Sequence, residues 1–440
     1  MTHPDELLAL DRRHVWHPFT QAKTAPDSVL IRSGKGAVVY GADGKEYLDL
    51  VSSWWVNLHG HAHPYIADAI AEQAHKLEQV IFAGLTHEPA VRLAQRLTSL
   101  LPGDLNRVFY SDNGSTAVEV ALKLALQYWR NLGRPERRRY LAFEGGYHGD
   151  TVGAMSVGVS SGFFAPFEDL LFEVDVLPFP ETWEGDAAVA EKEARCLSAL
   201  DAYLDRRGDE TAAVIIEPLV QGAGGMRMCR AEFLQALVQK LRAAGGLVIF
   251  DEVMTGFGRT GDLFACLSAG VTPDLICLSK GLTAGFLPLA ATVCRDPIYE
   301  AFLDTGFDKA FAHGHSFTAN PLGCAAGLAS LDLLMKEETR ARIAAIEARH
   351  RKHMARLAHH PKVTRPRVTG TIAALNVGVE DSGYAAAIGP RLKAFFLENG
   401  LLLRPLGEVI YFLPPYCISD SQLDRSYDTL ERALTTLNPA

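Results

Sequence analysis

The sequence predicts an α/β protein with a mostly parallel central sheet in a large domain and a smaller α+β domain. In the middle of the chain, short apolar runs that end in polar or glycine-rich turns alternate with segments of helical periodicity. Continuous apolar runs of this length are typical of strands that are buried on both faces of a parallel sheet. After about residue 330 the pattern changes to a long charged helical stretch, short strands and a last helix.

The central elements can be placed in order along the chain. Three apolar runs are expected to be strands: 139–143, 212–216 and 246–250. Helices are expected over roughly 116–131 and 231–244. Ligands of such sheets bind at the carboxyl ends of the strands, so the polar residues that follow these runs are candidates for a site.

Three regions are expected from these changes in pattern. Residues 1–60 form an N-terminal segment that packs with the small domain, 61–330 form the large domain, and 331–440 form the small C-terminal domain. Around the start of the last region, residues 329–359 are helix-like and charged. A chain of 440 residues exceeds one typical domain, which agrees with this division.

Composition excludes several classes of protein. The net charge of −9 argues against nucleic acid or an anionic membrane as a bulk partner. No apolar run approaches the roughly 20 residues of a membrane span. Seven scattered cysteines without a C-x-x-C pair indicate a reducing cytoplasm rather than disulfides or a zinc site. His59, His61 and His63 alternate without a suitably spaced cysteine or carboxylate, so we predict no metal.

Two residues at expected strand ends carry the strongest chemistry. Lys280 follows the apolar run 275–278 and precedes a glycine-rich turn. A buried lysine has a lowered pKa, and its neutral amine can form a Schiff base. Asp251 ends another strand. Without the other segments, a lysine at the position of Lys280 is more commonly a surface residue. In the same way, an aspartate such as Asp251 is more commonly a solvated residue at a strand end or a helix cap.

Three further segments fit around them. Gly114 and Ser115 stand directly before a helix, where backbone N–H groups and a hydroxyl bind phosphate. Thr116 and Glu119 have capping-box spacing, so a well-capped helix is the simpler alternative. Tyr147 lies in a glycine-rich turn and can stack on a ring, and residues 313–321 are rich in hydroxyl and backbone donors. Together the segments suit pyridoxal 5′-phosphate (PLP), whose pyridine nitrogen a carboxylate keeps protonated.

With these residues in hand, the chain resembles the class III aminotransferases, which are fold-type I PLP-dependent transferases. The run from Asp251 to Gly261, followed by Asp274 and by Ser279-Lys280, is similar to the signature of that class, and the likeness extends over about 12–420. The resemblance implies PLP as cofactor and a homodimer with active sites at the subunit interface.

Within the class, the chain is most similar to the adenosylmethionine–8-amino-7-oxononanoate aminotransferases of biotin synthesis. The stretches that carry this likeness are 14–18, 52–55 with 59–64, 147–151, and 403–405 with 411–416. The pair Trp54-Trp55 discriminates best. The implied reaction moves the amino group of S-adenosylmethionine through PLP to 8-amino-7-oxononanoate, giving 7,8-diaminononanoate.

The resemblance also implies roles for single residues. Lys280 holds the cofactor and transfers protons, Asp251 pairs with the pyridine nitrogen, and Tyr147 stacks on the ring. Phosphate ligands are expected from Gly114 and Ser115, and from His315 and Ser316 of a second subunit. Residues expected to bind substrate are Trp54, Phe19, Gly314, Arg404, Tyr411 and Arg259.

Three of these expectations have particular reasons. Arg404 is expected to bind the carboxylate of the oxononanoate. Phe19 stands where these relatives usually have tyrosine, so it is expected as an apolar wall without a hydroxyl. Because neighbouring residues of a strand face opposite ways, Trp54 is placed at the pocket and Trp55 can be core packing.

Other functions compete with this one. Another class III aminotransferase could use a diamine, lysine or an ω-amino acid as donor. A PLP-fold protein without catalysis would be a binding or regulatory module. A nicotinamide oxidoreductase is more distant, because the chain lacks a dinucleotide-binding fingerprint.

Overall fold

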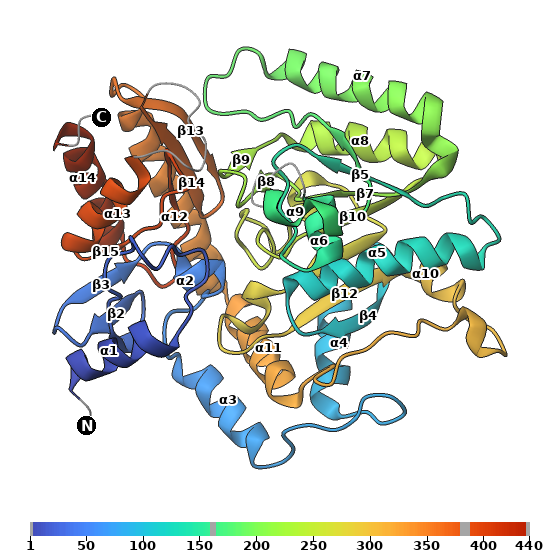
Figure 1. Cartoon of the computed structure of the whole chain (residues 1–440), viewed down its shortest axis with the longest axis horizontal. Coiled ribbons are helices and arrows are strands. Elements are labelled where there is room, and N and C mark those ends of the chain that lie inside the picture. The colour runs from blue at the N-terminus through green and yellow to red at the C-terminus, as the bar shows by residue number, and fades with distance from the viewer. Residues whose placement is uncertain (1–2, 159–163, 379–387, 437–440) are drawn as a thin grey trace.

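The computed structural model describes residues 3–158, 164–378 and 388–436 of the chain. Its centre is a seven-stranded sheet of order β4-β12-β11-β10-β7-β5-β6, in which β12 is antiparallel to both neighbours and the other pairs are parallel. The strands are β4 (Leu105–Ser111), β5 (Arg139–Phe143), β6 (Asp175–Leu177), β7 (Thr211–Ile216), β10 (Leu247–Asp251), β11 (Leu275–Leu278) and β12 (Ala290–Arg295). This sheet and its helices fill the right-hand part of Figure 1.

Helices cover this sheet on both faces, with α5 (Gly114–Asn131) in one core and α7 (Val189–Arg207) and α8 (Ala231–Ala243) in the other. The other helices of this part are α3 (Pro64–Ala74), α4 (Glu88–Leu100), α6 (Val152–Val157), α9 (Ala265–Ala269), α10 (Asp296–Glu300) and α11 (Pro321–Leu334). A two-stranded hairpin of β8 (Val220–Gln221) and β9 (Arg227–Met228) lies beside them.

Alternate residues of the central strands enter two different cores. In β7, Ala213 and Ile215 pack in the cluster that contains α5, whereas Val214 and Ile216 pack in the cluster that contains α7 and α8. All six residues of β7 are buried. A strand needs apolar residues at every position only when both faces of its sheet are covered. The predicted α/β class is therefore confirmed.

The smaller domain is built from both ends of the chain. One sheet has the order β1-β2-β3-β15, in which β15 is parallel to β3, and a second, antiparallel sheet has the order β13-β14-β16. The strands are β1 (Ile31–Lys35), β2 (Val38–Gly41), β3 (Glu46–Asp49), β13 (Val363–Thr369), β14 (Ile372–Val377), β15 (Leu401–Leu402) and β16 (Val409–Phe412). In Figure 1 these blue and red segments lie side by side on the left. The division at residues 60 and 330 stays a prediction.

Helices of this part are α1 (Pro4–His14), α2 (Ser52–Trp55), α12 (Glu337–Leu357), α13 (Ile388–Glu398) and α14 (Asp420–Thr436). The predicted helical stretch 329–359 is two helices, α11 and α12. They are separate because Lys336 has an extended backbone with ψ 141°, and the acidic Glu337 and Glu338 then open a new helix. Every helix in the described part of the chain is too short or too polar to span a lipid bilayer.

Candidate active site

Asp251 and Lys280 meet at the carboxyl end of the central sheet. Asp251 is the last residue of β10, and β11 leads through Ser279 to Lys280. The two strands are parallel neighbours in which Asp251 pairs with Cys277. Both side chains therefore line one cavity of about 600 Å³, the Lys280 cavity.

A second cavity of about 330 Å³ adjoins the first, and Lys280, Trp55, Tyr147 and Asp150 line both. We name it the aromatic cavity. Its other walls come from the N-terminal segment, the β8–β9 hairpin and the C-terminal strands, and they are Pro18, Phe19, Trp54, Ala223, Arg404, Leu406 and Tyr411. The predicted residues Trp54, Phe19, Arg404 and Tyr411 are thus brought together, beside Lys280.

Lys280 is largely buried in an unusual backbone conformation. Burial lowers the pKa of its amine from 10.5 to about 8, and the nearby carboxylates of Asp251 and Glu217 oppose only part of this effect. Its Nζ lies 4.5 Å from the ring centre of Trp55. The φ of Lys280 is +41°, a left-handed value that costs free energy in a residue with a side chain and is found mainly at functional sites.

This pKa has a measurable consequence. We expect the rate at which cofactor-free protein reacts with PLP to rise about tenfold per pH unit below about pH 8 and to level off above it, because only the neutral amine reacts. Absorbance of the bound cofactor between pH 6 and pH 10 measures this rate. A rate that still rises near pH 10 would show that the amine has an ordinary pKa.

Asp251 is held by two hydrogen bonds. Its Oδ1 accepts from the N–H of Val253 at 3.0 Å, and its Oδ2 lies 2.7 Å from Nδ1 of His148, which donates to it. Burial alone lowers the pKa of His148, but the hydrogen bond and the charge of Asp251 outweigh it, and the net direction is upward. A carboxylate oxygen has two lone pairs, so each oxygen of Asp251 can accept one further hydrogen bond. His148 was not predicted from the sequence, although it directly follows Tyr147.

Glu217 is a second residue that the sequence reasoning missed. It follows β7, is buried, and lines the Lys280 cavity. Its carboxylate accepts from the backbone N–H of Tyr147 at 3.0 Å and of Gly222 at 2.9 Å. Burial raises its pKa to about 7, although His148 and these N–H groups act against the shift. The strand-end rule that pointed to Asp251 could have found Glu217 too.

The N-terminus of α5 opens into the Lys280 cavity through Gly114 and Ser115. The capping box is formed by Asn113 and Thr116, not by Thr116 and Glu119 as predicted. Glu119 instead accepts from the N–H of Gly153 at 2.7 Å, which caps α6. The end of α5 is therefore capped by a neighbouring side chain and still has N–H groups for an anion.

The turn after β5 packs closely against this helix end. A Cβ atom at Gly149 would lie 1.9 Å from Oγ of Ser115, and one at Gly114 would lie 2.6 Å from Cγ1 of Val253. Tyr147 lies in the same turn and donates from Oη to Asp150 at 3.0 Å. Burial, supported by Asp150, raises the pKa of this phenol. Because these glycines have no side chain, the turn that carries Tyr147 can lie directly against the N-terminus of α5, and both line the Lys280 cavity.

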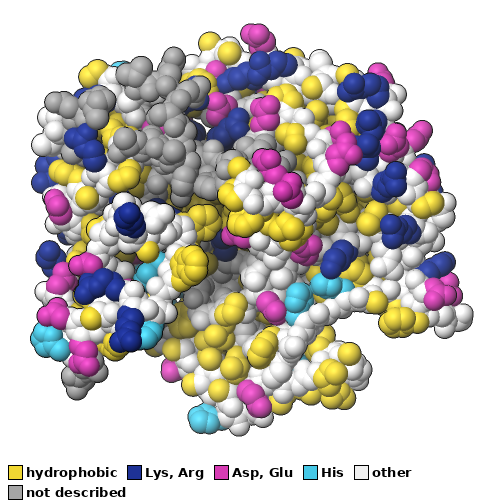
Figure 2. Space-filling model, viewed as in Figure 1, with side chains coloured by type: hydrophobic (Ala, Val, Ile, Leu, Met, Phe, Trp, Pro, Cys, Tyr) yellow, Lys and Arg dark blue, Asp and Glu magenta, His cyan; other side chains and the backbone are white. Residues whose placement is uncertain are grey.

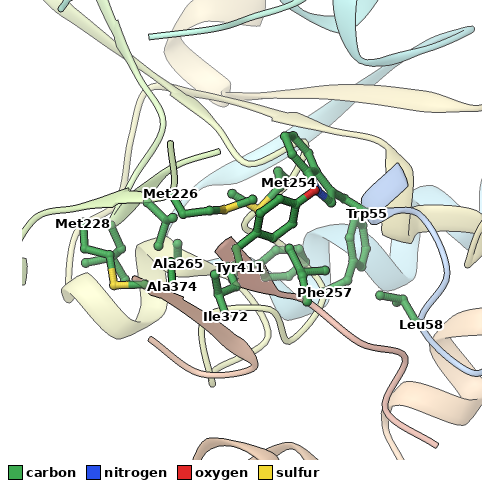
Figure 3. Close-up of a cluster of buried hydrophobic side chains, with 14 of the residues drawn as sticks. Trp55, Leu58, Met226, Met228, Met254, Phe257, Ala265, Ile372, Ala374 and Tyr411 are labelled. Carbon is green, nitrogen blue, oxygen red and sulfur yellow. The ribbon is translucent and has the colours of Figure 1, made fainter. Parts of the chain in front are cut away.

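Both tryptophans of the pair line the aromatic cavity, and Trp55 is at the same time buried in the hydrophobic core, as expected for one of the two. They lie in the short turn α2, where Ser53 and Trp55 have φ of +62° and +69°, so the alternation of a strand does not apply. Trp55 donates from Nε1 to Oη of Tyr411 at 3.0 Å, and Figure 3 shows the two groups pointing toward one another.

Trp54 packs between two other predicted residues. Its ring meets that of Phe19 edge to face with centroids 5.7 Å apart, and the guanidinium of Arg404 lies 4.4 Å from its ring centre. Trp54 and Phe19 are 40% and 52% exposed, so this wall of the cavity is open in the single chain.

Arg259, which we predicted to bind substrate, has a different position. It is buried, and its guanidinium donates to the carbonyls of Pro414 and Asn57 at 2.9 Å each and of Trp55 at 3.4 Å. It is not among the described residues that line either cavity. Backbone carbonyls accept from both terminal nitrogens of its guanidinium, so it fixes the chain at Trp55 and Asn57 to Pro414.

Gly314, His315 and Ser316 are likewise outside the described walls of both cavities. Gly314 and Ser316 are exposed, and Nδ1 of His315 lies 3.6 Å from Asp112. Of the alternating histidines, His59 bonds to the carbonyl of Ser330. No cluster of three or more potential metal ligands occurs within the described ranges.

The residues of the Lys280 cavity fit PLP. Lys280 offers a buried amine of lowered pKa, Asp251 a positioned carboxylate, Gly114 and Ser115 a helix N-terminus for phosphate, and Tyr147 an aromatic ring. PLP is one planar ring that carries an aldehyde for the amine, a pyridine nitrogen for the carboxylate and a phosphate for the helix N-terminus.

Comparisons with known proteins agree with this fit. The model of the family Aminotransferase class-III matches residues 20–434. The chain is 59% identical over 414 residues to the adenosylmethionine-8-amino-7-oxononanoate aminotransferase of Synechococcus elongatus, covering 94% of this chain and 96% of that protein. The protein of the same name from Geobacter sulfurreducens is 42% identical, with 97% of each chain covered.

Solved structures extend the likeness to the whole fold. The adenosylmethionine-8-amino-7-oxononanoate aminotransferase of Methanocaldococcus jannaschii superimposes with a TM-score of 0.91 at 34% identity, covering 99% of this chain and 100% of that one. An (S)-enantioselective omega-transaminase of Thermomicrobium roseum reaches 0.93 at 32% identity, with 99% of each chain covered. The chain therefore belongs to the class-III aminotransferases and is a PLP-dependent aminotransferase of fold type I.

Proposed function

We propose that this enzyme transfers the amino group of S-adenosylmethionine to 8-amino-7-oxononanoate and so makes 7,8-diaminononanoate for biotin synthesis. The observation that carries the proposal is the junction of the two cavities at Lys280, where the second cavity has aromatic walls and contains Arg404. The acceptor is a long aliphatic chain with a ketone and a remote carboxylate. Apolar walls suit the chain, and a guanidinium suits the carboxylate. The names of the relatives support the same pair of substrates.

The residues of the chain account for the amino transfer. Bound PLP supplies an electron sink and carries the amino group from one substrate to the other. Lys280 holds the cofactor, and its neutral Nζ can take a proton from the substrate carbon that bears the amine and return it. Asp251 pairs with the ring nitrogen, and His148 keeps that carboxylate in place. The donor leaves as a 2-oxo acid and the ketone becomes an amine, so no outside oxidant is needed.

The pocket is proposed to complete itself in a homodimer. Ser316 is exposed and its carbonyl accepts from Gln79 at 2.8 Å. Ile81, Leu85 and Phe317 expose 67%, 53% and 59% of their surface. Figure 2 shows hydrophobic side chains gathered on the lower part of the molecule, where α3 and α11 lie in Figure 1. A second copy would cover such apolar side chains and bring its own Ser316 to the phosphate. Light scattering of the purified enzyme measures the mass that tests this.

The two half-reactions test the proposed function directly. S-adenosylmethionine alone should bleach the visible band of the bound cofactor, and 8-amino-7-oxononanoate should then restore it and yield 7,8-diaminononanoate by mass spectrometry. If lysine or a diamine bleaches the band and S-adenosylmethionine does not, the donor is wrong while the class of enzyme stands.

Arg404 should affect one half-reaction more than the other. In Arg404→Met, we expect KM for 8-amino-7-oxononanoate to rise about 10- to 100-fold, because a charge-assisted hydrogen bond contributes about 1.5–3 kcal/mol. The rate with S-adenosylmethionine should change less, since the donor's carboxylate lies beside its reacting amine. Stopped-flow absorbance separates the two steps.

Lys393→Met is the matched control for Arg404→Met. Burial, together with the charge of Arg404, lowers the pKa of Lys393, so the control removes a nearby cation that does not line the described cavity wall. Equal effects of both substitutions would mean that general charge, not a bond from Arg404, attracts the acceptor.

A further inference from the structure

The turn that presents both tryptophans is held in a costly conformation. Ser52, Ser53 and Trp55 have φ of +51°, +62° and +69°, all in the left-handed region that residues with side chains rarely adopt. Three such residues within four positions persist only where the surroundings fix them. Contacts between α2 and the rest of the fold must therefore supply the free energy that stabilises this conformation.

Asp49 fixes the start of this turn. It ends β3 and is 1% exposed. Its Oδ1 accepts from the N–H of Val51 at 3.1 Å, and its Oδ2 accepts from the N–H of Ser53 at 2.7 Å. One buried carboxylate thus binds two backbone donors of the turn, which fixes the direction in which the chain enters it.

His61 supports Asp49 from the other side of the turn. Its Nε2 lies 2.9 Å from Oδ2 of Asp49, and its side chain is 16% exposed. The backbone N–H of His61 donates to Gly36 at 2.8 Å, and a Cβ atom at Gly34 would lie 2.6 Å from Cβ of His61. His61 is thus anchored on the hairpin of β1 and β2. The contact between Asp49 and His61 joins the two ends of segment 49–61, which contains α2.

The far side of the turn is attached to the C-terminal strands. Ser52 donates from Oγ to the carbonyl of Leu413 at 2.7 Å, and Arg259 donates to the carbonyl of Trp55. Trp55 also meets Tyr411, as Figure 3 shows. These contacts fix the position of the turn against the C-terminal strands. Asp49 and His61 instead act on the φ angles of the turn, through the N–H of Ser53.

We propose that Asp49 and His61 are positioning residues for the acceptor pocket. By holding Ser52, Ser53 and Trp55 at positive φ, they place Trp54 against Phe19 and Arg404 and place Trp55 over Lys280. The pair thereby sets how well the aromatic cavity accepts a long apolar substrate. The identity of that substrate rests on the proposed function, but the role of the pair in the geometry does not.

The experiment compares Asp49→Asn, His61→Ala and His61→Gln in the holoenzyme. Asparagine cannot accept all three hydrogen bonds of Asp49, so we expect KM for 8-amino-7-oxononanoate to rise at least about tenfold while the maximal rate of the half-reaction with S-adenosylmethionine changes less than about twofold. His61→Ala should have a similar but smaller effect. His61→Gln keeps a donor and should restore most of the affinity. A general loss of structure would lower the amount of active enzyme instead of splitting KM from the rate.

Asp43→Asn is the matched control, because Asp43 also accepts from a backbone N–H and a side chain, Lys45 and Tyr47, in a turn away from α2. It should leave KM unchanged. A crystal structure of Asp49→Asn gives a second readout that needs no substrate: Ser52, Ser53 and Trp55 should leave the left-handed region and Trp54 should leave the cavity. An unchanged turn, or equal KM in all variants, would overturn the proposal. Wild-type enzyme that ignores 8-amino-7-oxononanoate would overturn the proposed function, while the crystal structure would still decide the role of the pair.

Discussion

Replacing Lys280 with alanine is expected to lower kcat by at least about four orders of magnitude, because one atom then fails in two tasks. In the proposed mechanism, Nζ of Lys280 attaches the cofactor and moves the proton at the substrate carbon. The purified variant should lack the visible band of the wild-type holoenzyme, and single-turnover kinetics should show no transfer within hours.

The fold should survive this substitution. Lys280 is followed by a short turn with hydrogen bonds of its own, such as that from the N–H of Leu282 to the carbonyl of Ser279 and that from Oγ of Ser330 to the carbonyl of Gly281. Its Nζ contributes a contact with the ring of Trp55 but no ion pair within the described residues. Lys45→Ala, on an exposed turn, is the control and should leave both kcat and the spectrum unchanged. If Lys280→Ala retained more than about a hundredth of kcat, another group would have to carry the proton.

The second large effect is expected for Asp251→Asn, with kcat lower by about three orders of magnitude and KM changed little. Asparagine has the same shape and can keep one hydrogen bond with His148 or Val253. It has no charge, so under the proposed role of Asp251 it would no longer keep the pyridine nitrogen protonated, and the cofactor would lose its strength as an electron sink. The rate of either half-reaction, followed by absorbance, measures the loss.

Asp274→Asn is a matched control for this experiment. Asp274 is also a buried carboxylate beside the central sheet, and it accepts from Arg295 at 3.1 Å and from the N–H of Val248 at 2.9 Å, away from the Lys280 cavity. Its replacement should lower the melting temperature and leave kcat of the folded enzyme nearly unchanged. Similar losses of kcat in both variants would indicate that Asp251 acts through the fold and not on the cofactor.

Local pattern was enough to predict most of the central architecture. The strands β5, β7 and β10 and the helices α5 and α8 lie within two residues of their predicted bounds, because continuous apolar runs and helical periodicity are properties of short segments. Local pattern also predicted that Asp251 and Lys280 lie close together. Strands of a parallel sheet end at one edge, so polar residues at two such ends had to approach one another.

The missed and corrected features depend on contacts between distant segments. His148 became a partner of Asp251 only because β5, β7 and β10 are neighbours in the sheet. Arg259 looked available for substrate in the sequence, yet carbonyls of Asn57 and Pro414, from both ends of the chain, accept from its two terminal nitrogens. Side-chain type does not reveal which backbone carbonyls a buried guanidinium will find.

By itself, the sequence determined the α/β class, the strand ends that carry Lys280 and Asp251, and the helix that opens at Gly114, because each follows from the order of residues within one segment. Tertiary structure alone decided that Trp54 and Trp55 both face the aromatic cavity. The left-handed turn at Ser52 and Ser53 is unfavourable in isolation. It is stable only because Asp49, His61 and the C-terminal strands bind it from elsewhere in the fold.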